Sequence, residues 1–294
     1  MAIMEIDKEK NIKSIILQLG KDVWQSFQAD NVPLVAAGVA FYLILSMIPL
    51  LLLIISIAAY FITANQISAI SQEMIKSFGA GIGTAIETQI FSVVHNRGVL
   101  TGISLFVGLW AGSQIFVIIE TALNKIWDVT ETRPFWVTRG LALAMVAVTG
   151  ILLLVAVVMT YIIRILAGIN IPVLSSYIQR IPGIMTLLFD FVLPCIMIIL
   201  AFLFIYRFLS AYKVTWGMAL PGAAIAGLLC TLMLQVFSWY SSAFSDYNTL
   251  YGSLGGLVLL MLWFHYSAMI LLLGAEITRI VHQYRSSADV THPG

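Results

Sequence analysis

The sequence predicts an all-α, polytopic membrane protein built as a bundle of six transmembrane helices. The 294 residues are 61% hydrophobic and only 10% charged, and their mean hydropathy of +1.00 is far above that of soluble domains. Six apolar runs each reach the roughly 20 residues that a helix needs to cross a bilayer core. Nearly all Lys and Arg residues fall between these runs. A soluble protein is therefore excluded.

The six predicted spans follow one another along the chain. They cover residues 33–62, 98–119, 140–163, 183–206, 218–240 and 255–281. Residues 1–32 are polar and lack the apolar stretch of a signal peptide, so we expect a cytoplasmic N-terminal segment there. Residues 33–281 form the predicted membrane domain, and residues 282–294 a cytoplasmic tail.

The first predicted span is longer than a bilayer requires and contains Pro49 near its middle. Proline removes a helix hydrogen bond, so we expect a tilt or a kink at this point. Structural accommodation explains such a kink, and this is the interpretation we favour. The alternative is a hinge that lines a pathway, which makes Pro49 a hinge candidate.

Residues 65–97 form the longest connection and carry an amphipathic pattern. Apolar residues recur there at every fourth position, namely Ile70, Met74, Phe78, Ile82, Ile86 and Ile90. Three glycines between residues 79 and 83 interrupt the pattern, so we expect two short helices on the outer side of the membrane. Packing on the membrane surface is the simpler interpretation, and a lid over an outward cavity is the alternative.

The orientation follows from the positive charges, because cation-rich loops stay in the cytoplasm. With six spans, eleven of the 15 Lys and Arg residues fall on one side and four on the other. Both termini are therefore predicted to be cytoplasmic. The cations are spread over several loops and not gathered on one face, so they do not indicate a nucleic-acid partner.

Ionisable groups are costly inside a membrane, so each is a functional candidate. On the second span, polar residues fall within about 120° of one another, namely Trp110, Ser113, Gln114, Glu120 and Asn124. On the last span, His265, Glu276 and Arg279 share nearly one face, and Glu276 and Arg279 can pair across one turn. Hydrogen bonding between helices explains the first stripe as well as transport does, and a lone histidine is more often a satisfied core residue than a proton relay.

Other charged residues have structural interpretations. Asp190 and Arg164 are predicted to form an ion pair that fixes packing in the outer leaflet. Arg133, Arg139 and Arg207 are predicted to be cytoplasmic, where contact with lipid headgroups is the usual role and binding of a substrate phosphate the alternative.

No strong enzyme motif is present. The sequence lacks a phosphate-binding loop, a metalloprotease HExxH, a CxxC pair and a GxSxG elbow. The histidines His95, His265, His282 and His292 are scattered, and Cys195 and Cys230 lie inside predicted spans, where they are expected to pack as small hydrophobic residues. We therefore expect no enzyme activity, no cofactor and no metal site.

Three stretches resemble the YihY/BrkB family of bacterial inner-membrane proteins across nearly the whole hydrophobic region. They are AAGVAFYLILSMIPLLL at 36–52, WAGSQIFVIIETALNKIWDVTETRPFW at 110–136 and LYGSLGGLVLLMLWFHYSAMILLLGAEITR at 250–279. The family has been labelled ribonuclease BN, but this sequence lacks the HxHxDH-type cluster with which a zinc-dependent nuclease activates water. Other members are linked to serum resistance and proposed to move lipid or lipopolysaccharide precursors.

The resemblance thus implies an inner-membrane transporter, flippase or exporter of an amphipathic anion such as a lipid or lipopolysaccharide precursor. The alternative is a non-transporting membrane scaffold or envelope-integrity factor. Membrane lipids are the expected partners, without nucleic acid, and six spans are few for a lone transporter, which favours a homo-oligomer. The candidates for the substrate pathway or its cytoplasmic gate are Gln114, Glu120, Asn124, Arg133, Arg139, His265, Glu276 and Arg279. In such a gate the arginines meet a phosphate and the glutamates hold them when the site is empty.

Overall fold

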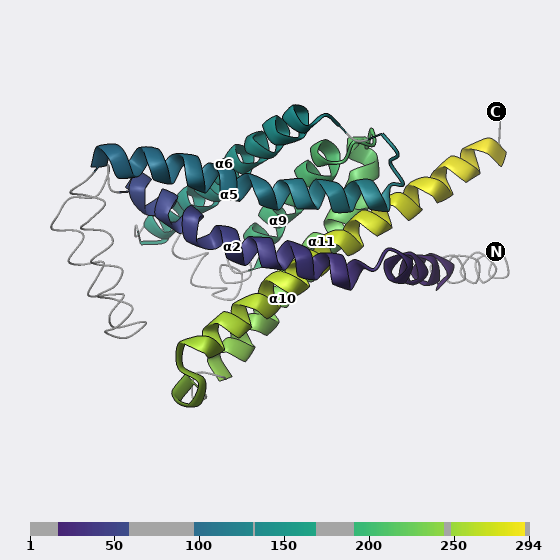
Figure 1. The fold of residues 1–294 in the computed structure, drawn as a ribbon. Coiled ribbons are helices and arrows are strands. Elements are labelled where there is room, and N and C mark those ends of the chain that lie inside the picture. The colour runs from purple at the N-terminus through teal and green to yellow at the C-terminus, as the bar shows by residue number, and fades with distance from the viewer. Residues whose placement is uncertain (1–16, 59–96, 132, 169–190, 244–247, 292–294) are drawn as a thin grey trace. The chain divides into compact units, whose positions relative to one another are not determined.

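In a computed structural model, the chain is described over residues 17–58, 97–131, 133–168, 191–243 and 248–291, and these parts are entirely helical apart from short connections (Figure 1). The helix Leu17–Ala29 comes first. The others are α2 (Val32–Ala58), α5 (Arg97–Ile126), α6 (Phe135–Gly168), α9 (Leu193–Phe204), the π-helical turn η2 (Ile205–Leu209), α10 (Trp216–Ala243) and α11 (Asn248–Thr291). The chain divides into two compact units, Met1–Phe41 with Val117–Gly294, and Tyr42–Phe116.

Several of these helices are long and apolar enough to cross a membrane. Four segments meet that test alone: Leu105–Ile126, Phe135–Val155, Trp216–Tyr240 and Val258–Ser286. The bent pair Leu17–Ala29 and Val32–Met47 raises the number to five, and Leu193–Leu209 is a shorter apolar helix. The described chain thus confirms an all-helical, multi-pass membrane protein with four to five candidate spans where the sequence predicted six. Of the predicted span 183–206, the structure describes only the part from residue 191.

The larger unit is built around α10, which packs against both α9 and α11. Glycines make these approaches close. A Cβ atom on Gly222 would collide with Thr278 and with the backbone of Gly274 in α11, and one on Gly227 would collide with Ile199 in α9. Small residues at helix crossings allow the backbone contact that drives association in lipid. The three helices are therefore locked at positions where no larger residue fits.

A bend falls just before α2. Leu17–Ala29 and Val32–Met47 meet at 61°, and Asn31 between them takes a positive φ of 52°, a conformation that asparagine tolerates better than most residues. Pro49 lies inside α2, which stays helical on both sides of it. The hinge role of Pro49 remains a prediction.

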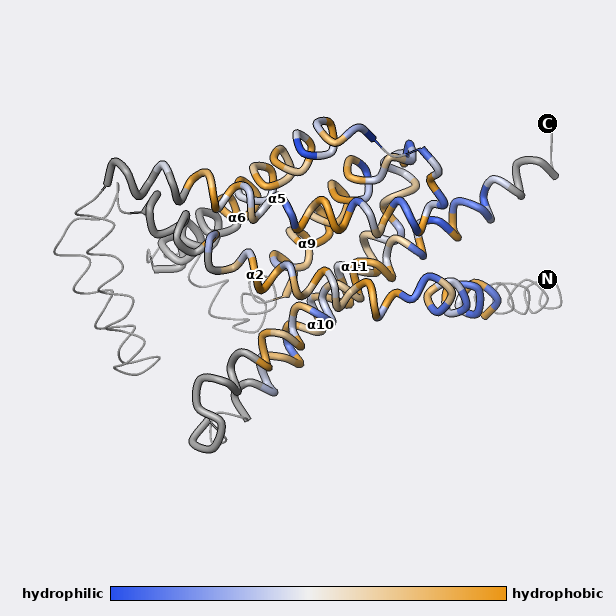
Figure 2. Tube along the Cα trace, viewed as in Figure 1, coloured by the Kyte–Doolittle hydropathy of each residue, from blue (hydrophilic) through white to orange (hydrophobic). Residues whose placement is uncertain are grey.

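Several helices extend beyond the predicted spans, and for α5 and α11 the extension reaches candidate residues or the predicted tail. α5 continues to Ile126 and therefore carries Glu120 and Asn124, whereas the predicted span ended at residue 119. α11 continues to Thr291, so most of the predicted tail 282–294 is helical. Hydropathy located the apolar part of each helix, but hydrogen bonding carries a helix on into polar sequence. In Figure 2 the polar residues of α11 lie beyond its apolar stretch, toward the C-terminus.

Some predictions fall outside the described residues. The amphipathic helices predicted within 65–97 lie almost wholly there, as does Asp190. Arg164 lies in α6, but its side chain is not among those described, so its ion pair with Asp190 stays a prediction.

Candidate gate at the polar helix ends

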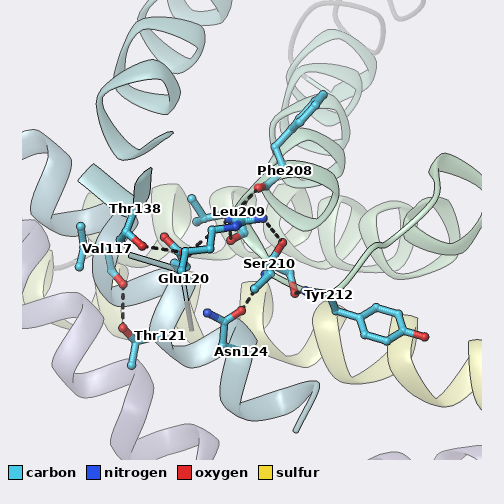
Figure 3. A network of polar contacts seen from close by, with 11 residues as sticks. Val117, Glu120, Thr121, Asn124, Thr138, Phe208, Leu209, Ser210 and Tyr212 are labelled. Carbon is cyan, nitrogen blue, oxygen red and sulfur yellow. Dashed lines mark hydrogen bonds and ion pairs between the residues drawn. The ribbon is translucent and has the colours of Figure 1, made fainter. Parts of the chain in front are cut away.

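Polar ends of several helices meet within the larger unit. The end of α5, the connection 127–134, the start of α6, the end of η2 and the connection 210–215 form one network, part of which Figure 3 shows. The helix Leu17–Ala29 and the polar end of α11 form a second network with residues that follow α5. Both networks join side chains and backbone groups from segments far apart in the sequence.

Arg133 is the centre of the first network. Its Nη1 donates to the carbonyl oxygens of Phe208 at 3.3 Å and Leu209 at 3.0 Å, and its Nη2 to that of Ser210 at 2.7 Å. These carbonyls belong to the end of η2, where no further helical turn supplies donors. The planar guanidinium therefore caps a helix C-terminus with three hydrogen bonds from two nitrogen atoms, a geometry that the single nitrogen of a lysine could not reproduce.

Asn124 supports the same turn from α5. Its Oδ1 accepts a hydrogen bond of 2.8 Å from the backbone N–H of Ala211, directly after the carbonyls that Arg133 holds (Figure 3). The hydroxyl of Ser210 then accepts from the N–H of Tyr212 at 3.2 Å. The end of α5 and the connection after it therefore fix the chain as it leaves η2.

Glu120 is almost fully buried beside Arg133. Its Oε1 lies 3.3 Å from Nη1 of Arg133 in an ion pair, and also accepts from the hydroxyl of Thr138 at 3.3 Å. Its other oxygen, Oε2, is buried and has no hydrogen-bond partner. A buried carboxylate oxygen without a donor is costly, so this atom marks the site for closer attention.

A pocket opens next to this pair. Its volume is about 270 Å³. We call it the Glu120 pocket, and its lining residues are Glu120, Thr121, Asn124, Lys125, Val129, Arg133 and Thr138. It combines a buried carboxylate, two cationic side chains and hydroxyl groups in one small space, an arrangement that suits a small polar group bearing charge.

The second network, which we call the Arg279 cluster, consists of Ser26, Asp30, Asp128, Glu276 and Arg279. The Arg279 guanidinium lies 3.0 Å from the carboxylate of Glu276, 3.4 Å from that of Asp128 and 3.6 Å from that of Asp30. It also donates to the hydroxyl of Ser26. Glu276 has no exposed side-chain surface, whereas Asp128 is 86% exposed. One cation thus holds three carboxylates that extend from the core to the surface.

Lys125 joins the two networks. It lines the Glu120 pocket, and its Nζ donates at 2.7 Å to the carbonyl oxygen of Asp30, a residue of the Arg279 cluster. Asp128 follows α5 with a positive φ of 48°, which turns the chain toward Arg279. Nearby, the rings of Trp127 and Tyr212 stack at 4.4 Å, and the Tyr212 hydroxyl lies 3.2 Å from Nε2 of His282.

The structure brings together five of the predicted pathway residues. Glu120, Asn124 and Arg133 share the pocket, and Glu276 and Arg279 form the expected pair across one turn. Arg139 is buried with its guanidinium 5.6 Å from the Phe135 ring centre, and it does not line the pocket.

Two other candidates lie elsewhere. His265 precedes Glu276 by about three helical turns, or roughly 16 Å along α11, and its ring contacts Tyr266. Gln114 belongs to the part of α5 in the smaller unit. Their roles remain predictions.

Sequence reasoning missed several members of these networks. They are Ser26, Asp30, Lys125, Asp128 and Thr138. All lie in polar sequence at or near helix ends, where a polar residue is ordinarily exposed, so polarity alone could not identify them. Their one shared signal is that they flank the spans on the side predicted to be cytoplasmic. Within the described ranges, no group of three or more His, Cys, Asp or Glu side chains is placed to hold a metal ion.

Comparison with known proteins gives consistent matches over most of the chain. A family model described as Virulence factor BrkB matches residues 23–293. The ribonuclease-like protein YfkH of Bacillus subtilis (strain 168) is 26% identical over 266 residues, covering 86% of this chain and 91% of the relative. A UPF0761 membrane protein of Vibrio atlanticus (strain LGP32) is 26% identical over 267 residues, covering 90% of this chain and 83% of the relative. No solved structure matches the chain.

Proposed function

Because the chain belongs to the Virulence factor BrkB family, whose similar proteins include UPF0761 membrane proteins, we propose that it translocates an amphipathic substrate with an anionic headgroup. A lipid or a lipopolysaccharide precursor is the expected class, and the bacterial inner membrane the expected location. In this proposal the Glu120 pocket and the Arg279 cluster together form the cytoplasmic gate. The resemblance read from three stretches of sequence is confirmed by the family match.

The observation that carries the proposal is the Glu120 pocket itself. It places Lys125 and Arg133 next to a buried carboxylate at the polar end of a helix long enough to span the membrane. Ionisable side chains in such helices are expensive and usually mark substrate or ion pathways. A packing role alone does not require a space of about 270 Å³ among these charges.

The ion pairs support a competitive gate. Glu120 holds Arg133 and Glu276 holds Arg279. An arriving phosphate offers these cations and Lys125 an alternative anionic partner, and bonds between charged groups are the strong ones. Substrate binding would then weaken the contacts that tie Leu17–Ala29 to α11 through Arg279.

We further propose six spans with both termini in the cytoplasm. This is supported by the contacts between connections, because Lys125 reaches Asp30, Arg133 reaches Ser210 and Arg279 reaches Asp128. If these segments lie on the same side of the membrane, the chain crosses the membrane and returns between them three times. It does so through α2 and α5, through α6 and the α9–η2 segment, and through α10 and α11. The excess of Lys and Arg in these segments then makes the shared side cytoplasmic.

Translocation by the purified protein tests the proposal. A fluorescent anionic lipid is placed in one leaflet of proteoliposomes, and its appearance in the other leaflet is followed with and without an imposed proton gradient. We expect faster translocation than in protein-free liposomes in at least one of the two conditions. If the proteoliposomes translocate the lipid no faster than protein-free liposomes, both with and without the proton gradient, the transport proposal is contradicted.

The second candidate function is a membrane scaffold without transport. It is favoured by the commitment of Arg133 to Glu120 and to three backbone carbonyls, contacts that hold the protein together. A scaffold predicts that substitutions in the pocket change stability or complex formation and leave lipid distribution unchanged. Cleavage of RNA is not part of either proposal, because the polar groups of the pocket lie on helices that span or flank a membrane.

A further inference from the structure

The unused hydrogen-bonding groups of the Glu120 pocket indicate what it binds. Oε1 of Glu120 is engaged by Arg133 and Thr138, but Oε2 is buried and has no donor. The Glu120 side chain is only 3% exposed, so bulk water does not solvate it freely. A ligand that carries a hydrogen-bond donor would satisfy this oxygen and remove the cost of its burial.

Of the two cations that line the pocket, Lys125 is more available to a ligand than Arg133. Both Nη atoms of Arg133 are engaged, Nη1 with Glu120 and the carbonyls of Phe208 and Leu209, and Nη2 with the carbonyl of Ser210. Lys125 has three N–H donors and gives one to the carbonyl of Asp30. It is exposed at the edge of the pocket and follows Glu120 by five positions, about 7.5 Å along the axis of α5.

The depth of the pocket points to a lipid headgroup. Glu120 lies about two turns before the end of α5, which places it near the boundary between hydrocarbon and headgroups. Phe135 and Trp136 at the start of α6 are exposed, Trp136 by 80%, as is typical of aromatic side chains at that boundary. The volume of about 270 Å³ is below the usual range for whole drug-sized ligands and suits a headgroup.

We propose that the Glu120 pocket binds a phospholipid headgroup in which a phosphate diester is joined to a group that donates hydrogen bonds, either an ammonium or a hydroxyl. The phosphate contacts Lys125, and the donor group contacts the carboxylate of Glu120, whose buried Oε2 becomes reachable when the side chain turns toward the pocket that it lines. This inference rests on the proposed translocation function and specifies its headgroup as a phosphate diester, which leaves phosphatidylglycerol anionic and phosphatidylethanolamine zwitterionic. Phosphatidylethanolamine supplies the ammonium and phosphatidylglycerol the hydroxyls, whereas the quaternary ammonium of phosphatidylcholine has no N–H to donate.

Binding of short-chain lipids to the full-length protein in detergent tests the inference. Dioctanoyl forms of the three lipids are titrated calorimetrically into wild type, Glu120→Gln, Lys125→Gln and the control Glu131→Gln. Glu131 is an exposed carboxylate of the connection after α5 that does not line the pocket. We expect phosphatidylethanolamine, phosphatidylglycerol or both to bind at least about tenfold more tightly than phosphatidylcholine. One hydrogen bond to a charged group contributes enough free energy for about a tenfold change in affinity.

The variants separate the two contacts. Glu120→Gln should abolish the tighter binding of the donor-bearing lipids relative to phosphatidylcholine. Lys125→Gln should weaken the binding of all three lipids to the same extent, and Glu131→Gln should leave their binding unchanged. Tighter binding of phosphatidylethanolamine than of phosphatidylglycerol identifies the ammonium as the group that donates to Glu120, and the reverse order identifies the hydroxyl. Equal binding of phosphatidylcholine, or a preference that survives Glu120→Gln in a folded protein, would overturn the inference. Translocation without headgroup preference leaves the proposed function standing, and preference without translocation contradicts that function alone.

Discussion

At the scale of single residues, two arginines organise the polar end of the protein in different ways. Arg133 caps backbone carbonyls, so its contacts are geometric and depend on the planar guanidinium. Arg279 neutralises carboxylates, of which Glu276 is fully buried. Loss of Arg133 would leave carbonyls without donors, whereas loss of Arg279 would leave a charge without its partner. Arg133→Ala is therefore a poor probe of transport, because it removes a helix cap.

The Arg279–Glu276 pair predicts a measurable coupling. Arg279→Gln should lower the free energy of unfolding by about 3 kcal/mol, because the buried carboxylate of Glu276 loses its cation. The carboxylates of Asp30 and Asp128, which the same arginine pairs with, then add repulsion. The double variant Glu276→Gln with Arg279→Gln should regain much of this loss, because no uncompensated charge stays buried. Unfolding in mixed detergent, followed by tryptophan fluorescence, measures both.

A matched control comes from the same helix. Arg285 is exposed. Within the described residues, its one hydrogen bond is to the carbonyl oxygen of Gly217, at 3.4 Å. Arg285→Gln should change the unfolding free energy by less than about 0.5 kcal/mol. If the double variant is as unstable as Arg279→Gln alone, Glu276 and Arg279 are not coupled as described.

At the scale of helices, packing depends on glycines that leave no room for a side chain. Gly222 in α10 faces Thr278 and the backbone of Gly274 in α11, and a Cβ on Gly274 would in turn meet the hydroxyl of Tyr206. That hydroxyl donates at 2.6 Å to the carbonyl of Leu271, so it cannot move aside freely. The contact between α10 and α11 is therefore intolerant of even one added methyl group.

Gly222→Ala should destabilise the protein by about 1–3 kcal/mol, because backbone atoms must separate to admit the new methyl group. Gly217 in the same helix has no atom within 4 Å of the position where a Cβ would be built. Gly217→Ala should be neutral or slightly stabilising, since alanine favours helix. The two variants are compared by thermal unfolding in one detergent, and equal stability would contradict the close crossing.

The sequence could predict the helices because their length and hydropathy are set by the bilayer. It could also predict the Glu276–Arg279 pair, since both lie on one helix one turn apart. It could not predict that Arg133 would reach the carbonyls of η2, because that contact depends on how distant helices pack. For the same reason the sequence could not distinguish Asp30 and Asp128 from ordinary polar residues at helix ends, because their pairing with Arg279 arises only in the folded chain.

At the scale of the whole molecule, the proposed six-span topology places the connections that follow α5 and η2 on the same side as both termini. In a background of Cys195→Ala and Cys230→Ala, single cysteines at Glu131, Lys213 and Ser286 should react with an impermeant maleimide only after the cells are permeabilised. Ser242, near the other end of α10, should react in intact cells. Labelling of Glu131→Cys or Lys213→Cys from outside would contradict the topology.

Lipid translocation by Glu120→Gln and Glu131→Gln is compared with that of wild type, in proteoliposomes that contain equal amounts of folded protein. Both variants replace a carboxylate by an amide, but only Glu120 lines the pocket. If the pocket is on the substrate pathway, Glu120→Gln should slow translocation at least about tenfold, the value of one charged hydrogen bond, while Glu131→Gln keeps the wild-type rate. Translocation that is as fast in Glu120→Gln as in wild type would contradict the placement of the Glu120 pocket on the substrate pathway.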